Sequence, residues 1–176
     1  MSAPAPRPAY VGLGSNLDDP AAQVRKALDA LACLPGTRRV AASRLYRNPP
    51  MGPQDQPDYV NAVAALETTL DADTLLAELQ GIERAQGRVR GAERWGPRRI
   101  DLDLLVYDTA RIARAGLNVP HPGVAERAFV LVPLAEIAPA LEIPGVGQVA
   151  CLLAHIDTRA VVPLEDDAQP PPLKRT

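Results

Sequence analysis

The spacing of apolar residues changes along the chain from every second position to every third or fourth and back again. The stretch YVGLGSNL, beginning at Tyr10, predicts a short strand that ends in a Gly-Ser-Asn turn. Asp19 followed by Pro20 is typical of a helix N-cap and first helical position. Apolar residues then recur at the spacing of one helical face: Val24, Ala27, Leu28, Leu31 and Leu34. Pro35 and Gly36 are predicted to end this helix.

A proline-rich loop separates the next two predicted strands. Residues 38–47 are compatible with a strand, although their alternation is imperfect. Residues 48–58 hold four prolines, which lack the backbone N–H that a sheet needs, so they predict an exposed loop. Residues 59–67 alternate regularly and predict a strand. Asp71 then caps a predicted helix over residues 72–87.

A final alternating stretch, residues 100–107, predicts the strand that carries most of the chemistry. One side of this strand is expected to hold Ile100, Leu102, Leu104 and Val106, and the other Asp101, Asp103, Leu105 and Tyr107. The resulting order predicts the α/β (α+β) class, as a ferredoxin-like βαββαβ sandwich. Residues 124–138 and 141–155 add C-terminal helices and short strands to this prediction.

Length and charge limit what the protein can be. A chain of 176 residues favours one domain, which we predict over residues 10–163, between a disordered N-terminal tail (1–9) and a flexible proline-rich C-terminal tail (164–176). A net charge of -2 argues against a nucleic-acid or membrane-surface protein, and no apolar run reaches the roughly 20 residues of a membrane span. Cys33 and Cys151 are far apart and no signal-peptide pattern begins the chain, so we expect free thiols and a cytoplasmic location.

Asp101 and Asp103 are the first candidates for chemistry. Alternate residues of a strand project from one face, with Cα atoms roughly 6.5 to 7 Å apart, so the two carboxylates can converge. Adjacent carboxylates repel each other unless a cation lies between them. Mg²⁺ fits, because it takes one or two protein carboxylates and completes its shell with water and substrate phosphates. The alternative is a pair of solvated side chains on an exposed sheet face.

The segment RVRGAERWGPRR, residues 88–99, brings positive charge close to this pair. It holds one acid and five arginines: Arg88, Arg90, Arg94, Arg98 and Arg99. Guanidinium groups match phosphate oxygens in a bidentate way and stay charged, so the segment predicts a polyphosphate site beside a metal-binding pair. The alternative is a loop of solvated arginines. Trp95 can stack on a planar ligand or simply pack, and the absence of a G-x-x-x-x-G-K-[ST] motif excludes a P-loop.

Three further residues have open interpretations. His121 has no other ligand at metal spacing, so phosphate donation and loop packing are both compatible with its position. Arg127 and Phe129 can present a charge and a ring to a ligand, or form a surface cap and a core anchor. The Gly-x-Gly of VGLGSN lacks the rest of a dinucleotide fingerprint, and a turn that closes the first strand is a sufficient explanation for it.

Four blocks of the sequence together resemble the 6-hydroxymethyl-7,8-dihydropterin pyrophosphokinase family of folate biosynthesis. They are YVGLGSNL, YRNPPMGPQDQPDYVNAVAALET, RVRGAERWGPRRIDLDLLVYD and VPHPGVAERAFVLVPLAEIAP, within a similarity from about Tyr10 to about residue 155. The resemblance implies a ferredoxin-like monomer that transfers the pyrophosphoryl group of ATP to the pterin hydroxymethyl group and releases AMP. It also implies two Mg²⁺ ions that bind with ATP.

The resemblance assigns roles to individual residues. It implies catalytic roles for Asp101, Asp103, Arg88 and Arg98, with Asp101 and Asp103 as the metal ligands. It places the ATP site at Gln80, Glu83, Arg88, Arg90, Trp95, Arg98, His121 and Arg127. It places the pterin site at Asn48, Pro49, Met51, Tyr59, Asn61, Trp95, Phe129 and Asp101.

The sequence departs from some family members at three positions. Asn48 stands where a threonine is often found, which bears on the contacts to the pterin. Gly116 replaces an arginine, with Arg111 or Arg114 as possible substitutes, and Pro122 replaces a tyrosine.

Two other functions fit the sequence less well than this resemblance does. A two-metal phosphodiesterase also uses paired aspartates, but it needs more carboxylates and a basic track for its substrate. A ferredoxin-like RNA-binding module presents aromatic residues on its sheet and needs no Asp-x-Asp pair, and this chain has only 1 Trp, 4 Tyr and 1 Phe.

Overall fold

Six strands pair into one antiparallel sheet in the computed structural model, which describes residues 2–88 and 96–165. The first half of the chain forms β1 (Arg7–Ser15), α1 (Pro20–Ala32), β2 (Thr37–Ala42), β3 (Tyr46–Asn48), β4 (Tyr59–Thr68), α2 (Ala72–Ala85) and β5 (Asp101–Tyr107). The second half forms β6 (Ile112–Arg114), β7 (Leu117–Val119), α3 (Ala128–Ile137), β8 (Glu142–Ile143), β9 (Gly147–Gln148), α4 (Val149–Leu153) and β10 (Val162–Pro163).

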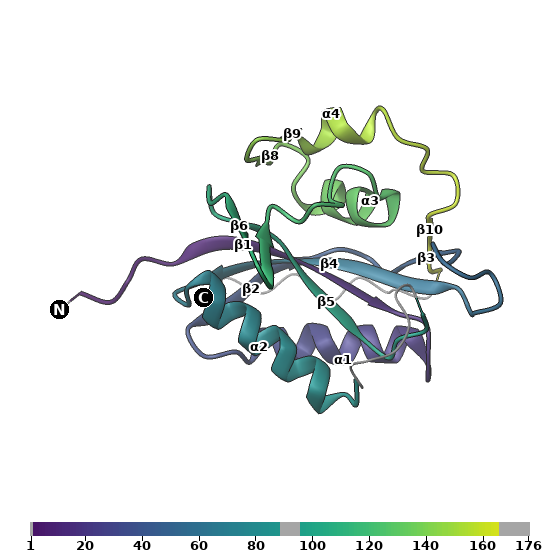
Figure 1. Cartoon of the computed structure of the whole chain (residues 1–176), viewed down its shortest axis with the longest axis horizontal. Helices are drawn as coiled ribbons and strands as arrows, with labels where there is room; N and C mark the ends of the chain where they lie inside the picture. Colours follow the sequence, from purple (N-terminus) through teal and green to yellow (C-terminus); the bar gives the residue numbers. More distant parts are fainter. Residues whose placement is uncertain (1, 89–95, 166–176) are drawn as a thin grey trace.

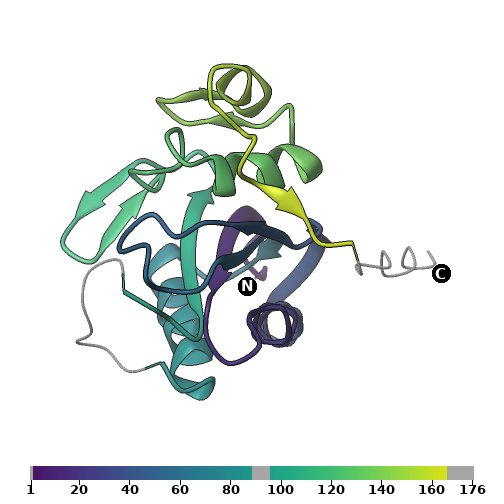
Figure 2. The same cartoon turned by 90° about the vertical axis from the view of Figure 1, so that its right-hand side faces the viewer.

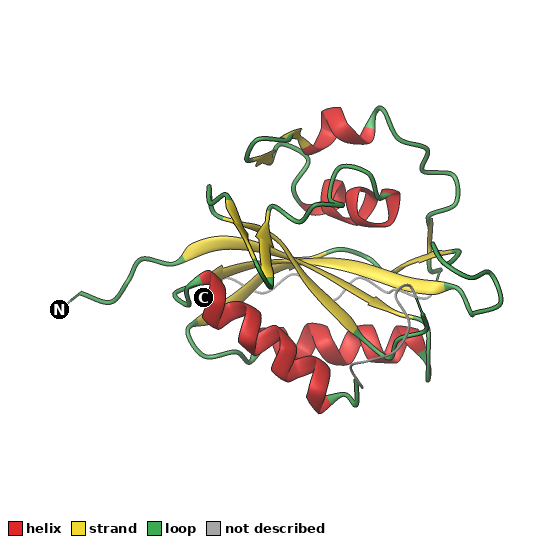
Figure 3. Ribbon diagram, viewed as in Figure 1, coloured by secondary structure: helices red, strands yellow, loops and turns green. Residues whose placement is uncertain are grey.

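The sheet has the topology of a ferredoxin-like sandwich. Its strands follow the order β10-β3-β4-β1-β5, and β2 also pairs with β4. Helices α1 and α2 cover one face, while α3 and α4 lie over the other (Figures 1 and 3). The chain returns across the second layer and adds β10 beside β3 (Figure 2). The predicted βαββαβ order is therefore confirmed.

Two aspartates start the helices of the first layer. The Asp19 carboxylate accepts a hydrogen bond from Ala22 N at 3.3 Å, and the Asp71 carboxylate accepts one from Thr74 N at 2.7 Å. Each bond satisfies a backbone N–H that has no partner within its helix. Both predicted caps are confirmed.

The sheet separates two cores. Leucines of α1 and α2, including Leu31, Leu75 and Leu79, pack against one face of the sheet with strand residues such as Val11. Leu131 and other residues of α3 pack on the opposite face. This second layer leaves part of its sheet face open, and the pocket described below lies there. No helix in residues 2–88 and 96–165 is long and apolar enough to cross a membrane.

The sheet begins earlier in the chain than its apolar pattern indicates. β1 starts at Arg7, and residues 7–9 pair with Thr68, Glu67 and Leu66 of β4. Ala9 is fully buried. Residues 7–9, assigned to the N-terminal tail from the sequence, therefore belong to the sheet because β4 is long enough to pair with them.

The segment predicted as one strand over residues 38–47 forms two strands, β2 and β3. Ser43 lies at the break between them, where its N–H donates to Val63 O at 2.9 Å and its Oγ accepts from Val63 N at 3.0 Å. Leu45 is buried immediately afterwards. A serine side chain thus replaces part of the backbone ladder, so both strands keep β4 as their neighbour while the chain bends.

Strand β5 contains a bulge that the sequence pattern does not reveal. The register with β1 shifts at Leu105, so this residue has no opposite partner in β1. Leu105 and Val106 both belong to the core beneath α3, and Tyr107 belongs to the opposite core. The predicted sides of Val106 and Tyr107 are therefore wrong, because the extra residue exchanges the two faces of the strand.

A short hairpin of β6 and β7 was not predicted. Its turn contains Gly116 at φ +83, in the left-handed region that favours glycine. A glycine at position 116 therefore fits the backbone of this turn.

The core beneath α3 can be tested with one truncation. Leu131 is fully buried, so Leu131→Ala should lower the free energy of unfolding by about 2 to 5 kcal/mol through lost burial and a cavity. Val146 lies in the same layer but is 41% exposed, so it is the matched control. Val146→Ala should change the free energy of unfolding by less than about 0.5 kcal/mol. Urea unfolding would measure both. Similar effects of the two variants would contradict this placement of Leu131.

Candidate active site

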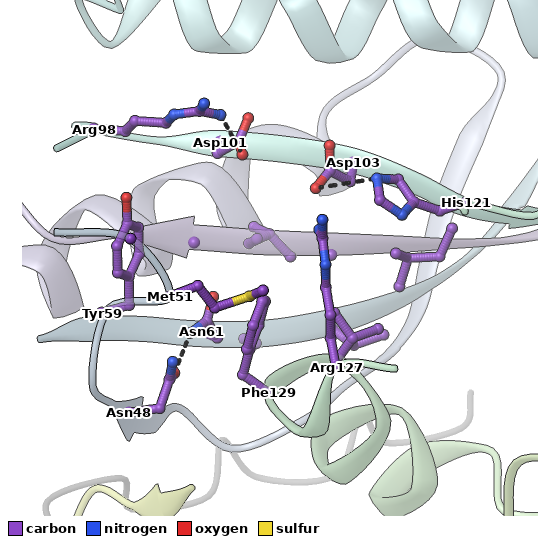
Figure 4. A pocket seen from close by; sticks show the side chains of 18 residues that line it. Asn48, Met51, Tyr59, Asn61, Arg98, Asp101, Asp103, His121, Arg127 and Phe129 are labelled. Atoms are coloured by element: carbon purple, nitrogen blue, oxygen red, sulfur yellow. Dashed lines mark hydrogen bonds and ion pairs between the residues drawn. The ribbon is translucent and has the colours of Figure 1, made fainter. Parts of the chain in front are cut away.

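A cavity of about 290 Å³ opens on the sheet face beside α3. Strands β1, β4 and β5 form its floor, and the loop after β3, His121 and the start of α3 form its walls. Figure 4 shows that side chains from these separate segments converge on the cavity. Ten residues predicted from the sequence line it: Asn48, Met51, Tyr59, Asn61, Arg98, Asp101, Asp103, His121, Arg127 and Phe129.

Two glycines of the central strand β1 make the floor of this cavity. Gly14 pairs with Asp101 of β5 on one side and with Asn61 of β4 on the other, and Gly12 pairs with Asp103. A Cβ atom at Gly14 would lie 2.7 Å from Asn61 Oδ1, which is closer than real side chains allow. The explanation of Gly-x-Gly as a turn is therefore wrong, because both glycines lie inside the strand and leave space for a ligand.

Asp101 is held by two arginines. Its Oδ1 accepts from Arg88 Nη1 at 2.7 Å and its Oδ2 accepts from Arg98 Nη1 at 2.9 Å. The Asp101 side chain is 24% exposed, so these are partly desolvated ion pairs. The pairing satisfies both oxygens of one carboxylate and holds the Arg98 guanidinium at one end of the cavity, with Arg88 behind Asp101.

Glu83 of α2 supports Arg88 from below the floor. Its carboxylate accepts from Arg88 Nη1 and from Leu102 N, the latter at 2.8 Å. Burial raises the pKa of Glu83, and the hydrogen bond from Leu102 N acts in the opposite direction. Glu83 is buried and does not line the cavity, so in this structure it positions Arg88 and the start of β5.

Asp103 has a different environment from Asp101. Its Oδ2 lies 3.9 Å from His121 Nε2, and Arg127 points toward it (Figure 4). Desolvation in the cavity, followed by repulsion from Asp101, raises the pKa of Asp103 to about 7. The two carboxylates of the pair therefore differ in their affinity for a proton.

His121 is oriented by the backbone. Its Nδ1 accepts a hydrogen bond from Gly123 N at 3.0 Å, and His121 N donates to Leu105 O at the β5 bulge. Burial, reinforced by the charge of Arg127, lowers the pKa of His121. Since Nδ1 is an acceptor, the neutral ring carries its proton on Nε2, which faces the cavity beside Asp103.

The other end of the cavity is formed by amides and rings. Asn61 Nδ2 donates to Asn48 Oδ1, and both residues are buried. Tyr59 OH donates to Gly96 O at 2.9 Å, and burial raises the pKa of Tyr59. Phe129 lies across the cavity near the exposed Met51 (Figure 4). This end has apolar walls and oriented hydrogen-bonding groups, which suits a flat heterocycle.

Some predicted site residues do not reach the cavity. Among the described residues, Pro49, Gln80, Glu83 and Arg88 are absent from its lining, although Arg88 pairs with Asp101 and Pro49 O accepts from Asn48 Nδ2. Arg90 and Trp95 lie outside the described residues. Arg114 pairs with Asp73 on α2 and Arg111 lies against Gly145, so neither substitutes in the cavity for an arginine at position 116.

Asn16 was missed by sequence reasoning. It is 1% exposed, and its Nδ2 donates to Gln56 Oε1 and to Pro57 O, each at 3.0 Å. Its Oδ1 accepts from Arg98 N at 2.8 Å, and its own N–H donates to Arg98 O at 3.0 Å. One amide thus joins the end of β1, the proline-rich loop and the segment before β5, and no local pattern in the sequence signals such contacts.

The fold is a ferredoxin-like sandwich, and its cavity places a carboxylate pair and arginines beside amide and aromatic side chains, an arrangement suited to an enzyme that transfers a phosphate-containing group. The family model for 7,8-dihydro-6-hydroxymethylpterin-pyrophosphokinase (HPPK) matches residues 10–139. The chain belongs to this family. The residues matched include every described part of the cavity.

Similar proteins agree with this assignment. The chain is 53% identical over 135 residues to 2-amino-4-hydroxy-6-hydroxymethyldihydropteridine pyrophosphokinase of Pseudomonas aeruginosa, covering 77% of this chain and 83% of that protein. It is 52% identical over 136 residues to the protein of the same name from Haemophilus influenzae, covering 77% and 84%. A solved structure of Plasmodium falciparum HPPK-DHPS with pteroate superposes with a TM-score of 0.68 at 13% identity, covering 88% of this chain and 43% of that one, which shows the shared fold.

The raised pKa of Asp103 predicts a pH-dependent stability. Its carboxyl has a pKa of about 7 in the folded protein and 3.8 ordinarily, so the folded state binds more protons between these values. The contribution of Asp103 to the free energy of unfolding should therefore fall as the pH rises from 3.8 to about 7. Asp103→Asn removes the effect, so in metal-free buffer the variant should gain stability relative to the natural sequence from pH 5 to pH 8. Urea unfolding at both pH values measures this, and an equal difference at both would refute it.

Proposed function

We propose that the carboxylate and arginine end of the cavity holds the phosphates of ATP, and that the amide and aromatic end holds the pterin. The reaction is the transfer of pyrophosphate from ATP to the hydroxymethyl group of 6-hydroxymethyl-7,8-dihydropterin, in folate synthesis. The hydroxymethyl oxygen bonds to the β-phosphorus and loses its proton to solvent, while the bond between that phosphorus and the α,β-bridging oxygen breaks and AMP leaves with this oxygen. The site assignment rests on one observation. Gly14 of β1 pairs with Asp101 on one side and with Asn61 on the other, so the proposed phosphate and pterin ends lie on the same sheet face.

Positive side chains supply the charge that polyphosphate requires. Arg98 and Arg127 line the cavity, and Arg88 lies behind Asp101. Arginine forks can move from a carboxylate to phosphate oxygens at little cost in geometry, because both partners accept bidentate hydrogen bonds. We infer that Arg88 and Arg98 turn from Asp101 to the triphosphate as charge develops on the phosphates during transfer.

The carboxylate pair fits Mg²⁺. Asp101 and Asp103 project from neighbouring pairs on the same sheet face, and no group of three or more potential ligands occurs in the described residues. Mg²⁺ matches such a sparse site, because substrate phosphates and water fill its remaining positions. We propose that these two aspartates hold the two Mg²⁺ ions that accompany ATP. When bound, these ions supply charge neutralisation for the phosphates.

Protein side chains align the reactants and keep water out. Asn61, Tyr59 and Phe129 orient the ring so that its hydroxymethyl group points along the floor toward Asp101 and Asp103. Arg98 and Arg127 balance negative charge that accumulates on the leaving AMP oxygen. The Nε2–H of His121 donates to a phosphate oxygen. Phosphoryl-type transfer demands mainly alignment and charge balance, so no side chain has to act as a base.

The reaction itself is tested directly. The protein should convert ATP and 6-hydroxymethyl-7,8-dihydropterin to AMP and the dihydropterin diphosphate in equal amounts, and a chelator should stop this conversion. Chromatography of the nucleotides and pterins would measure it. ADP formation, or AMP release without the pterin, would contradict the proposal. We further propose that the protein is a monomer, which sedimentation can test, and that it is a cytoplasmic protein with one domain between two tails.

Loss of one carboxylate should abolish transfer. Asp103→Asn keeps the shape of the side chain but removes a charge that holds Mg²⁺, so kcat/KM should fall by at least about a hundredfold. Asp108→Asn, the same change beyond the end of β5 at a residue paired with Arg7, is the matched control and should stay within about twofold of the natural sequence. Steady-state kinetics at saturating Mg²⁺ would measure kcat/KM for both variants and the natural sequence. A folded Asp103→Asn protein with normal turnover would exclude this role.

Arg98 should act more in the transition state than in binding. Arg98→Ala is expected to lower kcat about tenfold or more and to raise the Kd for MgATP less, because the guanidinium leaves Asp101 only as charge develops on the phosphates. Arg84→Ala, an exposed arginine of α2, serves as the control. Calorimetric ATP binding and single-turnover kinetics separate the two quantities. Equal losses in kcat and affinity would indicate uniform binding instead.

A further inference from the structure

Two asparagine side chains form a buried pair at the wall of the cavity. Asn48 ends β3 and Asn61 lies in β4, and they are 5% and 6% exposed. Both line the cavity, and Figure 4 shows their amides directed toward each other. Buried amides with no freedom to turn present a fixed pattern of donors and acceptors, so the direction of each amide decides what a ligand meets.

The backbone fixes the direction of the Asn48 amide. Asn48 Nδ2 donates to Pro49 O at 3.0 Å, and a carbonyl oxygen can only accept a hydrogen bond. The Asn48 NH₂ group must therefore face Pro49, and Asn48 Oδ1 faces Asn61. Asn61 meets this oxygen with its Nδ2, which donates to it.

The direction of the Asn61 amide follows from this chain of bonds. If the Asn61 amide were reversed, its carbonyl oxygen would face the carbonyl oxygen of Asn48, and the two would repel. Asn61 Oδ1 therefore lies over the floor, where a Cβ atom at Gly14 would be 2.7 Å away. Within residues 2–88 and 96–165, no donor is bonded to this oxygen. The cavity floor thus offers an acceptor at this point.

We propose that Asn48 is a positioning residue for substrate selection: it locks the Asn61 amide so that the carbonyl, and not the NH₂ group, faces the pterin. This inference rests on the proposed pterin site. The 2-amino-4-oxo edge of the substrate carries N–H donors on its amino group and on the adjacent ring nitrogen, and an aligned carbonyl accepts one of them. A heterocycle that presents only acceptors at this edge finds no donor there and is rejected.

A substitution at position 48 tests the lock. Asn48→Leu keeps the branched shape and the number of heavy atoms but removes the acceptor for Asn61 Nδ2, so the Asn61 amide is released. The Kd for 6-hydroxymethyl-7,8-dihydropterin should rise about tenfold or more, while the Kd for MgATP alone should stay within about twofold. Discrimination between the pterin and its analogue without the 2-amino group should shrink by a similar factor. Equal discrimination by Asn48→Leu and the natural sequence would overturn the proposal.

A double-mutant cycle separates positioning from general damage. If Asn48 acts through Asn61, Asn48→Leu should cost pterin affinity in the natural background and less than about twofold in an Asn61→Ala background. Full additivity would show that Asn48 acts independently and would also overturn the proposal. Asn48→Asp, which keeps an acceptor toward Asn61, should retain discrimination. If Asn48→Leu fails to fold, Asn48→Ala removes the same acceptor and enters the same cycle.

The experiments distinguish a failure of the positioning role of Asn48 from a failure of the proposed pterin site. If the natural protein does not bind the pterin, the proposed function fails. If it binds the pterin and the Asn48 variants retain its discrimination, only the positioning role fails.

Discussion

The absence of side chains at two positions of the central strand is the constraint on which the site depends. Every other element of the cavity is arranged around the space that Gly12 and Gly14 leave between β4 and β5. At Gly14 the constraint is strict, because an added Cβ would lie 2.7 Å from Asn61 Oδ1. At Gly12 the nearest atoms to an added Cβ belong to the Leu105 side chain, at 3.4 Å, which is an ordinary contact. A side chain at position 12 would therefore fill part of the cavity without distorting the backbone. Glycine weakens a strand, and the buried residues Val11 and Leu13, which point to the opposite core, offset that weakness.

The two adjacent carboxylates of the site, Asp101 and Asp103, have different electrostatic environments. Asp101 accepts from two guanidinium groups, whereas among the described residues Asp103 lies 3.9 Å from His121 and feels the charges of Arg127 and Arg98 at longer range. Two arginines neutralise one member of the pair, and the pKa of the other is raised to about 7, so the two carboxylates need not both carry an unbalanced negative charge without a ligand. The Asp103 side chain is 40% exposed, against 24% for Asp101, so solvent still reaches the carboxylate whose pKa is raised.

The sequence predicts the parts of this structure that depend on local periodicity. The alternation from Tyr59 to Thr68 and the caps at Asp19 and Asp71 are local signals, and each is confirmed. The bulge at Leu105 is invisible in sequence, because an extra residue in an apolar run preserves the apolar pattern while it exchanges the two faces of the strand. The Asp-x-Asp pair was found because both residues lie before the bulge, where period two still holds.

Residues that act through long-range contacts fall outside such reasoning. Asn16 contacts Gln56 and Arg98, and only the folded chain brings these together. The Asn48 and Asn61 pair likewise depends on the register of β3 against β4, in which Asn48 lies opposite Tyr59 and Tyr46 lies opposite Asn61. A shift of one residue would turn Asn61 into the opposite core. The resemblance to a family names such residues, but the register explains why their side chains can meet.

The cavity combines two kinds of construction. Its floor is part of a sheet with apolar cores on both faces, so the spacing of Asp101, Gly14 and Asn61 is set by backbone hydrogen bonds and by burial. One wall is held differently: Asn16 joins it through four hydrogen bonds to Gln56, Pro57 and Arg98, and Tyr59 adds one to Gly96. Hydrogen bonds contribute about 1 kcal/mol each to net stability. The floor residues Asp101 and Asn61 are therefore positioned by the sheet, whereas the position of Arg98 depends on the hydrogen bonds of Asn16.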